Sequence, residues 1–320
     1  MRRRVLLFLA SGLVLVLLAA YLVARQIGIP MPWAGGCVVR AEGSEVTLDQ
    51  EQAANAATIA AVGIRRQLPE RAVTIALATA WQESQLRNID HGDRDSLGLF
   101  QQRPSQGWGT PEQITDPVYA TNKFYDALVE IDGYTRLPLT EAAQEVQRSG
   151  YPQAYAKHET ASAVMAAALT GRVEGGLTCT LSGPRSLPEG ELNEVGLQPR
   201  AERVREALAR DFGELPLGGF EPGGVNYGHG SDSAHYDGRA IDVFFRPIDD
   251  ENQRHGWAVA QWAMAHAEEL DIATVIYDGK IWTQLRSAQG WRDYQVSPDA
   301  PGDRDILMHR DHVHLDVIGQ

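Results

Sequence analysis

Two short apolar segments with polar residues at alternate positions constrain the fold of this chain most. Residues 240–245, Ala-Ile-Asp-Val-Phe-Phe, and residues 312–317, His-Val-His-Leu-Asp-Val, both have the composition of buried strands. Side chains along a strand alternate between its two faces, so His312 and His314 point the same way. Asp242 lies in the first segment, and a carboxylate there is costly to bury unless it is paired or binds a metal. If the two strands are neighbours, Asp242, His312 and His314 converge on one place.

These side chains, together with His235, form a ligand set for a metal ion. His235 precedes the first strand and can close the site from its mouth. Three ligands of the His, Asp, His type suit Zn²⁺ and leave one coordination position for water. The metal would lower the pKa of that water and polarise a carbonyl, which is the chemistry of hydrolysis, above all of an amide. The alternative for any one of these histidines is a turn cap or a satisfied place in the core.

The pattern of these residues resembles a known signature. Ser-x-His-x-x-Gly-x-Ala-x-Asp at residues 233–242, followed by a His-x-His pair, is similar to the zinc D,D-peptidases. These are the D-alanyl-D-alanine carboxypeptidases and dipeptidases and the penicillin-insensitive murein endopeptidases. The resemblance implies that His235, Asp242 and His314 bind Zn²⁺. It also implies that His312 lies behind the ligands or contacts the transition state.

The position three residues before the His-x-His pair departs from one branch of that family. The carboxypeptidase branch has a glutamate there as general base, whereas this chain has His309, as the endopeptidase branch does. We therefore predict His309 as the general base, with Asp311 as the weaker candidate. His229, His255 and His266 have no partner in the motif, and we interpret them as structural or surface residues.

The N-terminus predicts export. Three arginines at residues 2–4 precede an apolar run over residues 5–24, which is about long enough to cross a bilayer. The arginines would stay cytoplasmic and place the rest of the chain outside. We interpret residues 1–36 as an uncleaved anchor in the cell membrane, with a cleaved signal peptide and a secreted protein as the alternative. The net charge of −13 argues against a nucleic-acid-binding protein.

The two cysteines, Cys37 and Cys179, flank one long segment. In an oxidising compartment they would form a disulfide that joins the ends of that segment. Closing so long a loop would stabilise the fold by about 4–5 kcal/mol in the chain-entropy description. Two unpaired buried thiols are the alternative, and neither cysteine has the sequence neighbours of a metal site or a nucleophile.

The segment between the cysteines is mostly helical by its pattern over residues 49–172. A helix predicted for residues 71–86 is surrounded by Ala, Leu and Trp and carries Glu83 near its C-terminal end. A glutamate in apolar surroundings has a raised pKa. A raised pKa suits a general acid that protonates a glycosidic oxygen near neutral pH. A solvated glutamate at a fraying helix end is the alternative.

A second resemblance rests on this segment. Glu83-Ser84, followed by Gly98-Leu-Phe-Gln101, resembles the lysozyme-like lytic transglycosylases. The resemblance implies that Glu83 is the acid/base and that Ser84, Gly98 and Gln101 border the saccharide groove. A later tyrosine-containing stretch stands where that family has a tyrosine motif, and we assign Tyr155 to substrate binding. Hydrolysis usually needs a second carboxylate, whereas lytic transglycosylases act with one glutamate, so the sequence leaves both reactions open.

A change of composition divides the chain. Residues 181–215 begin with Pro, Gly and charged residues without periodicity and continue into an amphipathic helix, so we predict a linker and helix. Residues 216–320 predict helices and a mainly antiparallel sheet, with an Asp-Gly hairpin at residues 273–283. We therefore expect a multi-domain chain, with an all-α lysozyme-like domain over residues 37–180 and an α+β zinc D,D-peptidase-like domain over residues 216–320.

Both resemblances concern enzymes that act on one polymer, peptidoglycan. The combination predicts a bifunctional peptidoglycan hydrolase that cleaves glycan strands with its first domain and peptide stems or cross-links with its second. The alternatives are that only one domain is catalytic and the other binds the cell wall, that the protein is a scaffold without activity, or that the metal domain acts on a soluble dipeptide.

Overall fold

The computed structural model describes residues 35–183, 186–230 and 232–320. The helices are α2 (Gln50–Arg65), α3 (Glu70–Ser84), η1 (Pro104–Gln106), α4 (Pro111–Ile114), α5 (Pro117–Val129), α6 (Leu139–Gln147), η2 (Ala156–His158), α7 (Glu159–Leu169), α8 (Pro199–Phe212), α9 (Asp250–Ala265), η3 (Gln284–Gln289) and α10 (Arg304–Leu307). The strands are β1 (Gly36–Ala41), β2 (Ser44–Leu48), β3 (Leu177–Thr180), β4 (Leu217–Gly218), β5 (Ala240–Phe244), β6 (Ile272–Tyr277), β7 (Lys280–Thr283), β8 (Arg292–Asp293) and β9 (His312–Val317).

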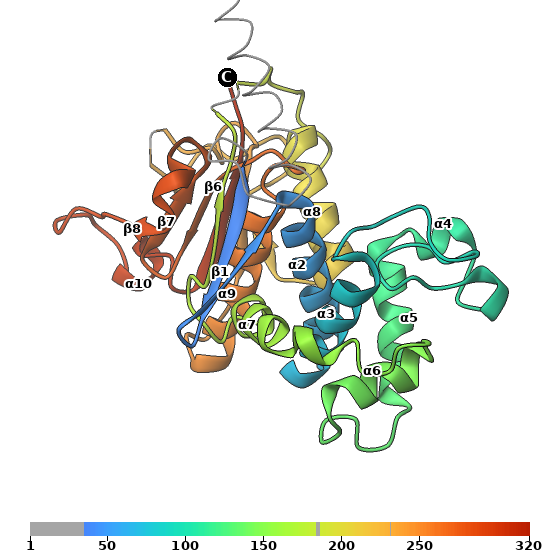
Figure 1. Cartoon of the computed structure of the whole chain (residues 1–320). Coiled ribbons are helices and arrows are strands. Elements are labelled where there is room, and N and C mark those ends of the chain that lie inside the picture. Colours follow the sequence, from blue (N-terminus) through green and yellow to red (C-terminus); the bar gives the residue numbers. More distant parts are fainter. Residues whose placement is uncertain (1–34, 184–185, 231) are drawn as a thin grey trace, which may run out of the picture.

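The first half of the chain contains a β-sheet, so the prediction of an all-α lysozyme-like domain over residues 37–180 is wrong. Strands β1, β2 and β3 form an antiparallel sheet in the order β2-β1-β3. Residues Glu42 and Gly43 both have positive φ and make the tight turn between β1 and β2. Side chains along β1 alternate between buried and more exposed positions, as expected for a strand with one face against the core. The fold is a mixture of helices and two sheets from its N-terminal region onward (Figure 1).

The disulfide between Cys37 and Cys179 is present, which confirms that prediction. The two cysteines stand directly opposite each other on β1 and β3. The bond therefore joins two neighbouring strands of the small sheet, and helix α7 packs against β1 and β2.

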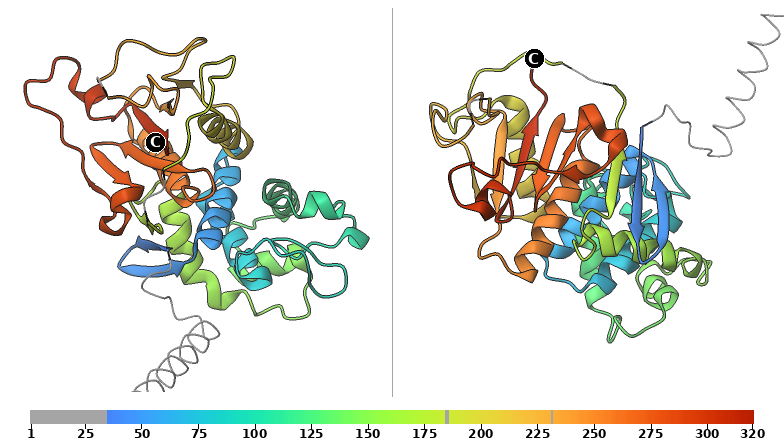
Figure 2. Two further views of the ribbon diagram at one scale, coloured as in Figure 1. Left: turned by 90° about the horizontal axis from the view of Figure 1, so that it is seen from above. Right: turned by 90° about the vertical axis from the view of Figure 1, so that its left-hand side faces the viewer.

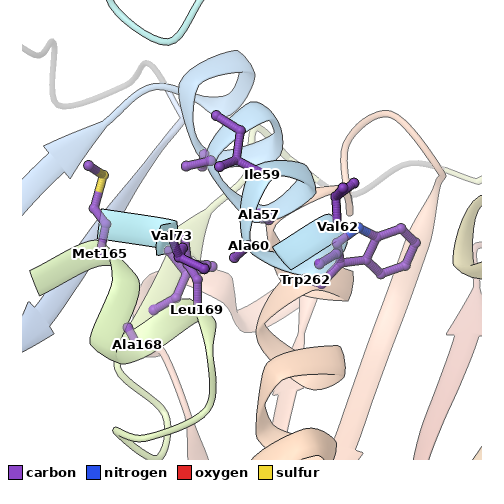
Figure 3. Packing of buried hydrophobic residues seen from close by; sticks show 14 of the residues in the cluster. Ala57, Ile59, Ala60, Val62, Val73, Met165, Ala168, Leu169 and Trp262 are labelled. Atoms are coloured by element: carbon purple, nitrogen blue, oxygen red, sulfur yellow. The ribbon is translucent and has the colours of Figure 1, made fainter. Parts of the chain in front are cut away.

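Helix α2 forms the centre of the molecule. Its alanine-rich sequence leaves little side-chain bulk, so other helices can approach it closely. In Figure 3, Val62 of α2 lies beside Trp262 of α9, while Val73 of α3 and Leu169 of α7 lie on the other side of the helix. Figures 1 and 2 show the same arrangement, with α2 between the large sheet and helices α4, α5 and α6.

The second sheet has six strands in the order β4-β5-β9-β6-β7-β8, and every neighbouring pair is antiparallel. The hairpin expected at residues 273–283 is formed by β6 and β7, with Asp278 and Gly279 at the turn. One face of the sheet is apolar and packs on α9, with Val243, Val275 and Leu315 all buried. The opposite face carries Asp242 and His314.

Buried polar contacts join the two halves of the chain. The side-chain amide of Gln261 in α9 donates to the carbonyl of Ala168 at 2.7 Å, and its oxygen accepts from the backbone N–H of Leu177 at 2.7 Å. The buried carboxylate of Asp211 accepts hydrogen bonds from Thr58 of α2 and from Trp262 of α9. A single hydrophobic core therefore extends across both halves. The domain boundaries at residues 180 and 216 stay a prediction.

The predicted membrane location is not borne out. In the part of the chain that the structure describes, no helix is both long enough and apolar enough to cross a bilayer. The anchor assigned to residues 1–36 rests on a run that lies outside the described residues. The transmembrane helix and the anchored location are therefore withdrawn.

Candidate metal centre and candidate carboxylic acid site

The pairing of β5 with β9 creates the first candidate site. Asp242 stands directly opposite His314 in this antiparallel pair. Opposed residues place their side chains on the same face, so the carboxylate and the imidazole meet. Asp242 Oδ1 lies 3.1 Å from His314 Nδ1. The prediction that these two strands are neighbours in the sheet is confirmed.

Three side-chain atoms form a nearly equilateral triangle at this site. His235 Nε2 lies 3.1 Å from His314 Nδ1 and 3.3 Å from Asp242 Oδ1, and the remaining edge is 3.1 Å. A tetrahedral zinc ion with bonds of about 2.0–2.1 Å holds its ligand atoms about 3.3–3.4 Å apart. All three side chains are buried, and the group could hold a metal ion. The donor set therefore fits a small tetrahedral ion.

Each histidine of the triangle also has a polar partner on its other nitrogen. His235 Nδ1 lies 2.7 Å from the carbonyl oxygen of Gly219, which can only accept, so Nδ1 carries the proton and the lone pair of Nε2 faces the site. His314 Nε2 lies 3.5 Å from Asp316 Oδ2. Such partners fix the tautomer and the ring orientation of metal-binding histidines.

The backbone of Gly219 is shaped around His235. Its φ of +79° is in the left-handed region, and a Cβ atom there would overlap the imidazole, lying 2.6 Å from Nδ1. We expect Gly219→Ala to displace His235 and to weaken zinc binding roughly 10- to 100-fold, the usual effect of disturbing a ligand's supporting contact. Competition with a chromophoric chelator measures this change.

Gly223 provides the matched control for Gly219→Ala. It lies in the same loop with φ +86°, but a Cβ atom there meets nothing within 4 Å. Gly223→Ala therefore carries the same backbone strain without the contact to His235. Equal zinc affinities for the two variants would contradict the role given to Gly219.

Burial and hydrogen bonding oppose each other in the titration of the site. Burial alone would raise the pKa of Asp242, but hydrogen bonds with His235 and His314 hold it well below its usual range. Burial alone would lower the pKa of His314, but its contacts with Asp242 and Asp316 raise that pKa to about 9. A metal ion requires a neutral imidazole, so zinc binding at neutral pH displaces a proton from this cluster.

His312 lies beside the triangle and not within it. Its Nε2 is 3.9 Å from Asp242 Oδ1, and its Nδ1 is 2.7 Å from Asp311 Oδ1. Arg246 donates to the other oxygen of Asp311 at 2.7 Å. This chain of contacts orients Nε2 of His312 toward the metal ligands. The assignment of His312 to the reaction stays a prediction.

His309, the first of the predicted bases, lies beside this cluster. Its ring centroid lies 4.6 Å from that of His312 and 5.8 Å from that of His314. Burial, followed by the neighbouring imidazoles, lowers the pKa of His309 to about 3, so the ring is neutral. Both oxygens of the other candidate, Asp311, are engaged by His312 and Arg246. The geometry therefore favours His309 over Asp311 as a proton acceptor.

Sequence reasoning missed several residues around the site. His229 was interpreted as structural or surface, yet its ring stacks on His235 with 4.1 Å between centroids. Gly219, Arg246 and Asp316 were also missed. Only Asp316 carried a signal, because it follows His314 by two residues and so shares its face of the strand.

The segment predicted as a linker supports the turn that carries His235. The backbone N–H of Gln198 donates to the carbonyl of Gly238 at 2.8 Å, and its side chain donates to the carbonyl of Asp237 at 2.8 Å. A Cβ atom on Gly238 would overlap Leu192. Leu192 and Gln198 therefore pack on the turn that follows His235.

The second candidate site lies at the C-terminal end of α3. Glu83 is half-buried, and the hydroxyl of Tyr155 donates to its Oε1 at 2.6 Å. Burial raises the pKa of Glu83, while the hydrogen bonds from Tyr155 and Gln147 act in the opposite direction. Glu83 therefore keeps its proton to a higher pH than an exposed glutamate, as the sequence analysis expected.

The other residues assigned to a saccharide groove have structural contacts. The hydroxyl of Ser84 is buried and donates to the carbonyl of Leu99 at 2.8 Å, which ties the helix end to the following loop. Gly98 has φ +71°, and a Cβ atom there would overlap the carbonyl of Ile114. The side-chain amide of Gln101 donates to the carbonyl of His91 at 3.2 Å. Their contact with a substrate stays a prediction.

An open cleft of about 1140 Å³ lies between α5, α6 and the loop around Trp108. Gln147 lines this cleft and donates to the carbonyl of Phe100 at 2.7 Å. Gln147 also lies close enough to Glu83 to lower its pKa, so the carboxyl group lies one side chain away from the cleft. The cleft is large enough for several sugar rings, which makes it the candidate groove for a chain-like substrate.

We expect Tyr155→Phe to raise the pKa of Glu83, because the phenolic hydrogen bond stabilises the charged carboxylate. If Glu83 acts as an acid in its protonated form, the alkaline limb of the pH–rate profile then moves to higher pH. Tyr151→Phe is the control, since Tyr151 is 81% exposed. An unchanged limb in Tyr155→Phe would remove Tyr155 from the site.

Comparison with known proteins concerns the second half of the chain. Residues 193–304 match the family model described as VldE, C-terminal domain. The matched stretch includes His235 and Asp242, and it ends before His309, His312 and His314. No curated protein matches the chain.

Proposed function

We propose that the chain is a peptidoglycan hydrolase whose second half cleaves a peptide bond with a zinc ion. The observation that carries this proposal is the triangle of His235, Asp242 and His314, with edges of 3.1–3.3 Å and a polar partner behind each histidine. The similarity of its residue pattern to zinc D,D-peptidases supports a peptide of peptidoglycan as the substrate.

Each residue of the site has a separate role in the proposed reaction. A zinc ion held by His235, Asp242 and His314 would supply Lewis acidity for the hydrolysis of an amide. Neutral His309 is placed to accept a proton. His312 donates its Nδ1–H to Asp311, so the lone pair of Nε2 faces the ligands and can accept a hydrogen bond from a water or a substrate N–H.

We propose that the first half cleaves the glycan strand, with Glu83 as the acid. Its half-buried carboxyl group, its raised pKa and the cleft beside Gln147 support this role. Both chemistries act on one polymer, which favours a bifunctional enzyme. The competing proposal is that one half is catalytic and the other binds the wall.

Mass spectrometry of purified peptidoglycan digested by the protein tests both activities at once. With zinc present we expect new peptide ends and new glycan ends, and a chelator should remove only the peptide ends. Anhydro or reducing sugar ends then distinguish transglycosylation from hydrolysis. Peptide cuts that persist in the chelator would refute the zinc proposal.

Two variants assign each activity to its site. Glu83→Gln should reduce glycan cleavage roughly 10²- to 10⁴-fold, the range for loss of a general acid, and leave peptide cleavage intact. Glu112→Gln, at an exposed position in α4, is its control. Asp242→Asn should have the opposite pattern. If neither variant changes its own activity, the assignment of the sites fails.

A further inference from the structure

We propose that the large sheet carries a second binding site, a pocket for a carboxylate group of the peptide substrate, on the same face as the candidate metal centre. The pocket lies at the far edge of that face, around Arg286 and Arg292. This inference rests on the proposed peptidase function, and it adds a substrate feature that the metal site alone does not specify.

The strand register places the metal site and the pocket on one face. Asp242 pairs with His314, His314 with Ile276, Ile276 with Ile281, and Ile281 with Arg292. Directly opposed residues share a face of an antiparallel sheet, so this row runs from the metal ligands to Arg292 without changing sides. The other face of the sheet is the one that packs on α9.

A second row reaches the same pocket. Asp316, which faces His314, pairs with Thr274, and Thr274 pairs with Thr283. Thr274, Ile281, Thr283 and Arg292 all line a pocket of about 530 Å³. The strands that hold the metal ligands therefore continue directly into the wall of the pocket.

The pocket contains two arginines among polar and apolar residues, and Ile318, Gly319 and Gln320 also line it. Arg286 and Arg292 line it beside Thr283 and Gln284, and Leu285 beside them is 73% exposed. Neither arginine forms an ion pair with any residue that the structure describes. The whole chain has a net charge of −13, so a pocket with two unpaired arginines differs in charge from the protein as a whole.

Arg292 has a donor that nothing in the described part of the chain satisfies. One terminal nitrogen of its guanidinium donates to Thr283 Oγ1 at 3.1 Å, while Nε is buried without a hydrogen-bond partner. Because Nε has almost no accessible surface, a ligand in the pocket reaches the guanidinium through its terminal nitrogens. The planar fork of arginine matches the two oxygens of a carboxylate.

The spacing between the two sites sets the position of that carboxylate. Three strand steps, from β9 through β6 and β7 to β8, separate His314 from Arg292. At about 4.8 Å per step this is about 14 Å, the length of about four residues of extended peptide. The expected substrate is a peptide with an acidic group about four residues from the cleaved bond.

Peptides of one length that end in D-alanyl-D-alanine test this spacing. Each contains one glutamate, placed two, four or six residues from the terminal amide bond, and each has a matched glutamine peptide. We measure the dissociation constant by calorimetry and the cleavage rate separately, with the full zinc-loaded protein. The glutamate at position four should bind roughly 10- to 100-fold more tightly than its glutamine partner, and the other positions should show little preference.

Arg292→Gln and Arg286→Gln should each reduce the preference at position four. Arg286 is exposed, so that variant should fold normally. Lys280→Gln is the charge-matched control, because Lys280 is an exposed residue of β7 that pairs with Asp293 outside the pocket. A preference that is absent, independent of position or unchanged in both arginine variants overturns the pocket. Position-dependent binding without cleavage instead refutes the peptidase function and retains the pocket.

Discussion

Asp242→Asn is expected to remove zinc binding and peptide cleavage together. The substitution keeps the size of the side chain but replaces an anionic ligand by a neutral amide, and two histidines alone hold zinc poorly. Loss of a residue that only supports a ligand usually costs 10- to 100-fold in affinity, so loss of a ligand should exceed roughly 100-fold. Equilibrium dialysis with zinc measures the affinity, and circular dichroism checks the fold.

Substitutions of two further aspartates provide the comparison for Asp242→Asn. Asp316→Asn should have an intermediate effect, because Asp316 contacts the outer nitrogen of His314 at 3.5 Å and not the ion. Asp237→Asn removes an ion pair with Arg239 in the turn after His235 and should leave zinc affinity close to that of the wild type. Wild-type affinity in Asp242→Asn would show that the triangle is a hydrogen-bonded cluster and not a metal site.

The double variant Cys37→Ser/Cys179→Ser is expected to lower the free energy of unfolding by about 4–5 kcal/mol. The disulfide joins residues that are 142 apart in sequence, so its removal releases a large loop in the unfolded chain. Urea denaturation, followed by tryptophan fluorescence, measures the change. The wild-type protein under a reducing agent should shift by a similar amount.

The control for the disulfide separates the crosslink from the loss of two buried side chains. Both cysteines are fully buried, and β1 pairs with β3 whether or not the bond is present. Cys37→Ala/Cys179→Ala removes the crosslink without burying two hydroxyl groups, so it should be at least as stable as the serine variant. If both variants unfold with the same free energy as the oxidised wild type, then the pairing of β1 with β3 persists in the unfolded chain. The disulfide would in that case add no further restriction to the unfolded ensemble.

The candidate metal centre was predictable because its signal is local. Alternation within β9 places His312 and His314 on one face, and a buried carboxylate in β5 needs a partner. The Asp-Gly turn between β6 and β7 predicted the hairpin for a similar reason. These inferences depend on neighbours along the chain, which the sequence displays directly.

The contacts that complete the site depend on tertiary structure. Gly219 is 16 residues from His235, and its carbonyl reaches the imidazole because β4, which ends at Gly218, pairs with β5 beside Asp242. Arg246 acts on His312 through Asp311, which is 65 residues further along the chain. No period or spacing in the sequence encodes such contacts.

The small sheet was missed for a different reason. The helical signal of α2 and α3 is strong, and it dominated the interpretation of residues 37–180. Strands β1, β2 and β3 are short and lie at the two ends of that segment, so each is weak alone. Their pairing joins residues about 140 apart, with Cys37 opposite Cys179.

If both candidate sites act on one polymer, as proposed, the packing of α2 on α9 affects how they meet it. Val62 and Trp262 lie side by side, and Asp211 accepts hydrogen bonds from both helices. A substrate bound at one site therefore has an effective concentration at the other site, and the packed core between the sites determines its value. In enzymes joined by a flexible tether, the length of the linker determines this value instead. Lengthening residues 181–198 would leave that effective concentration unchanged.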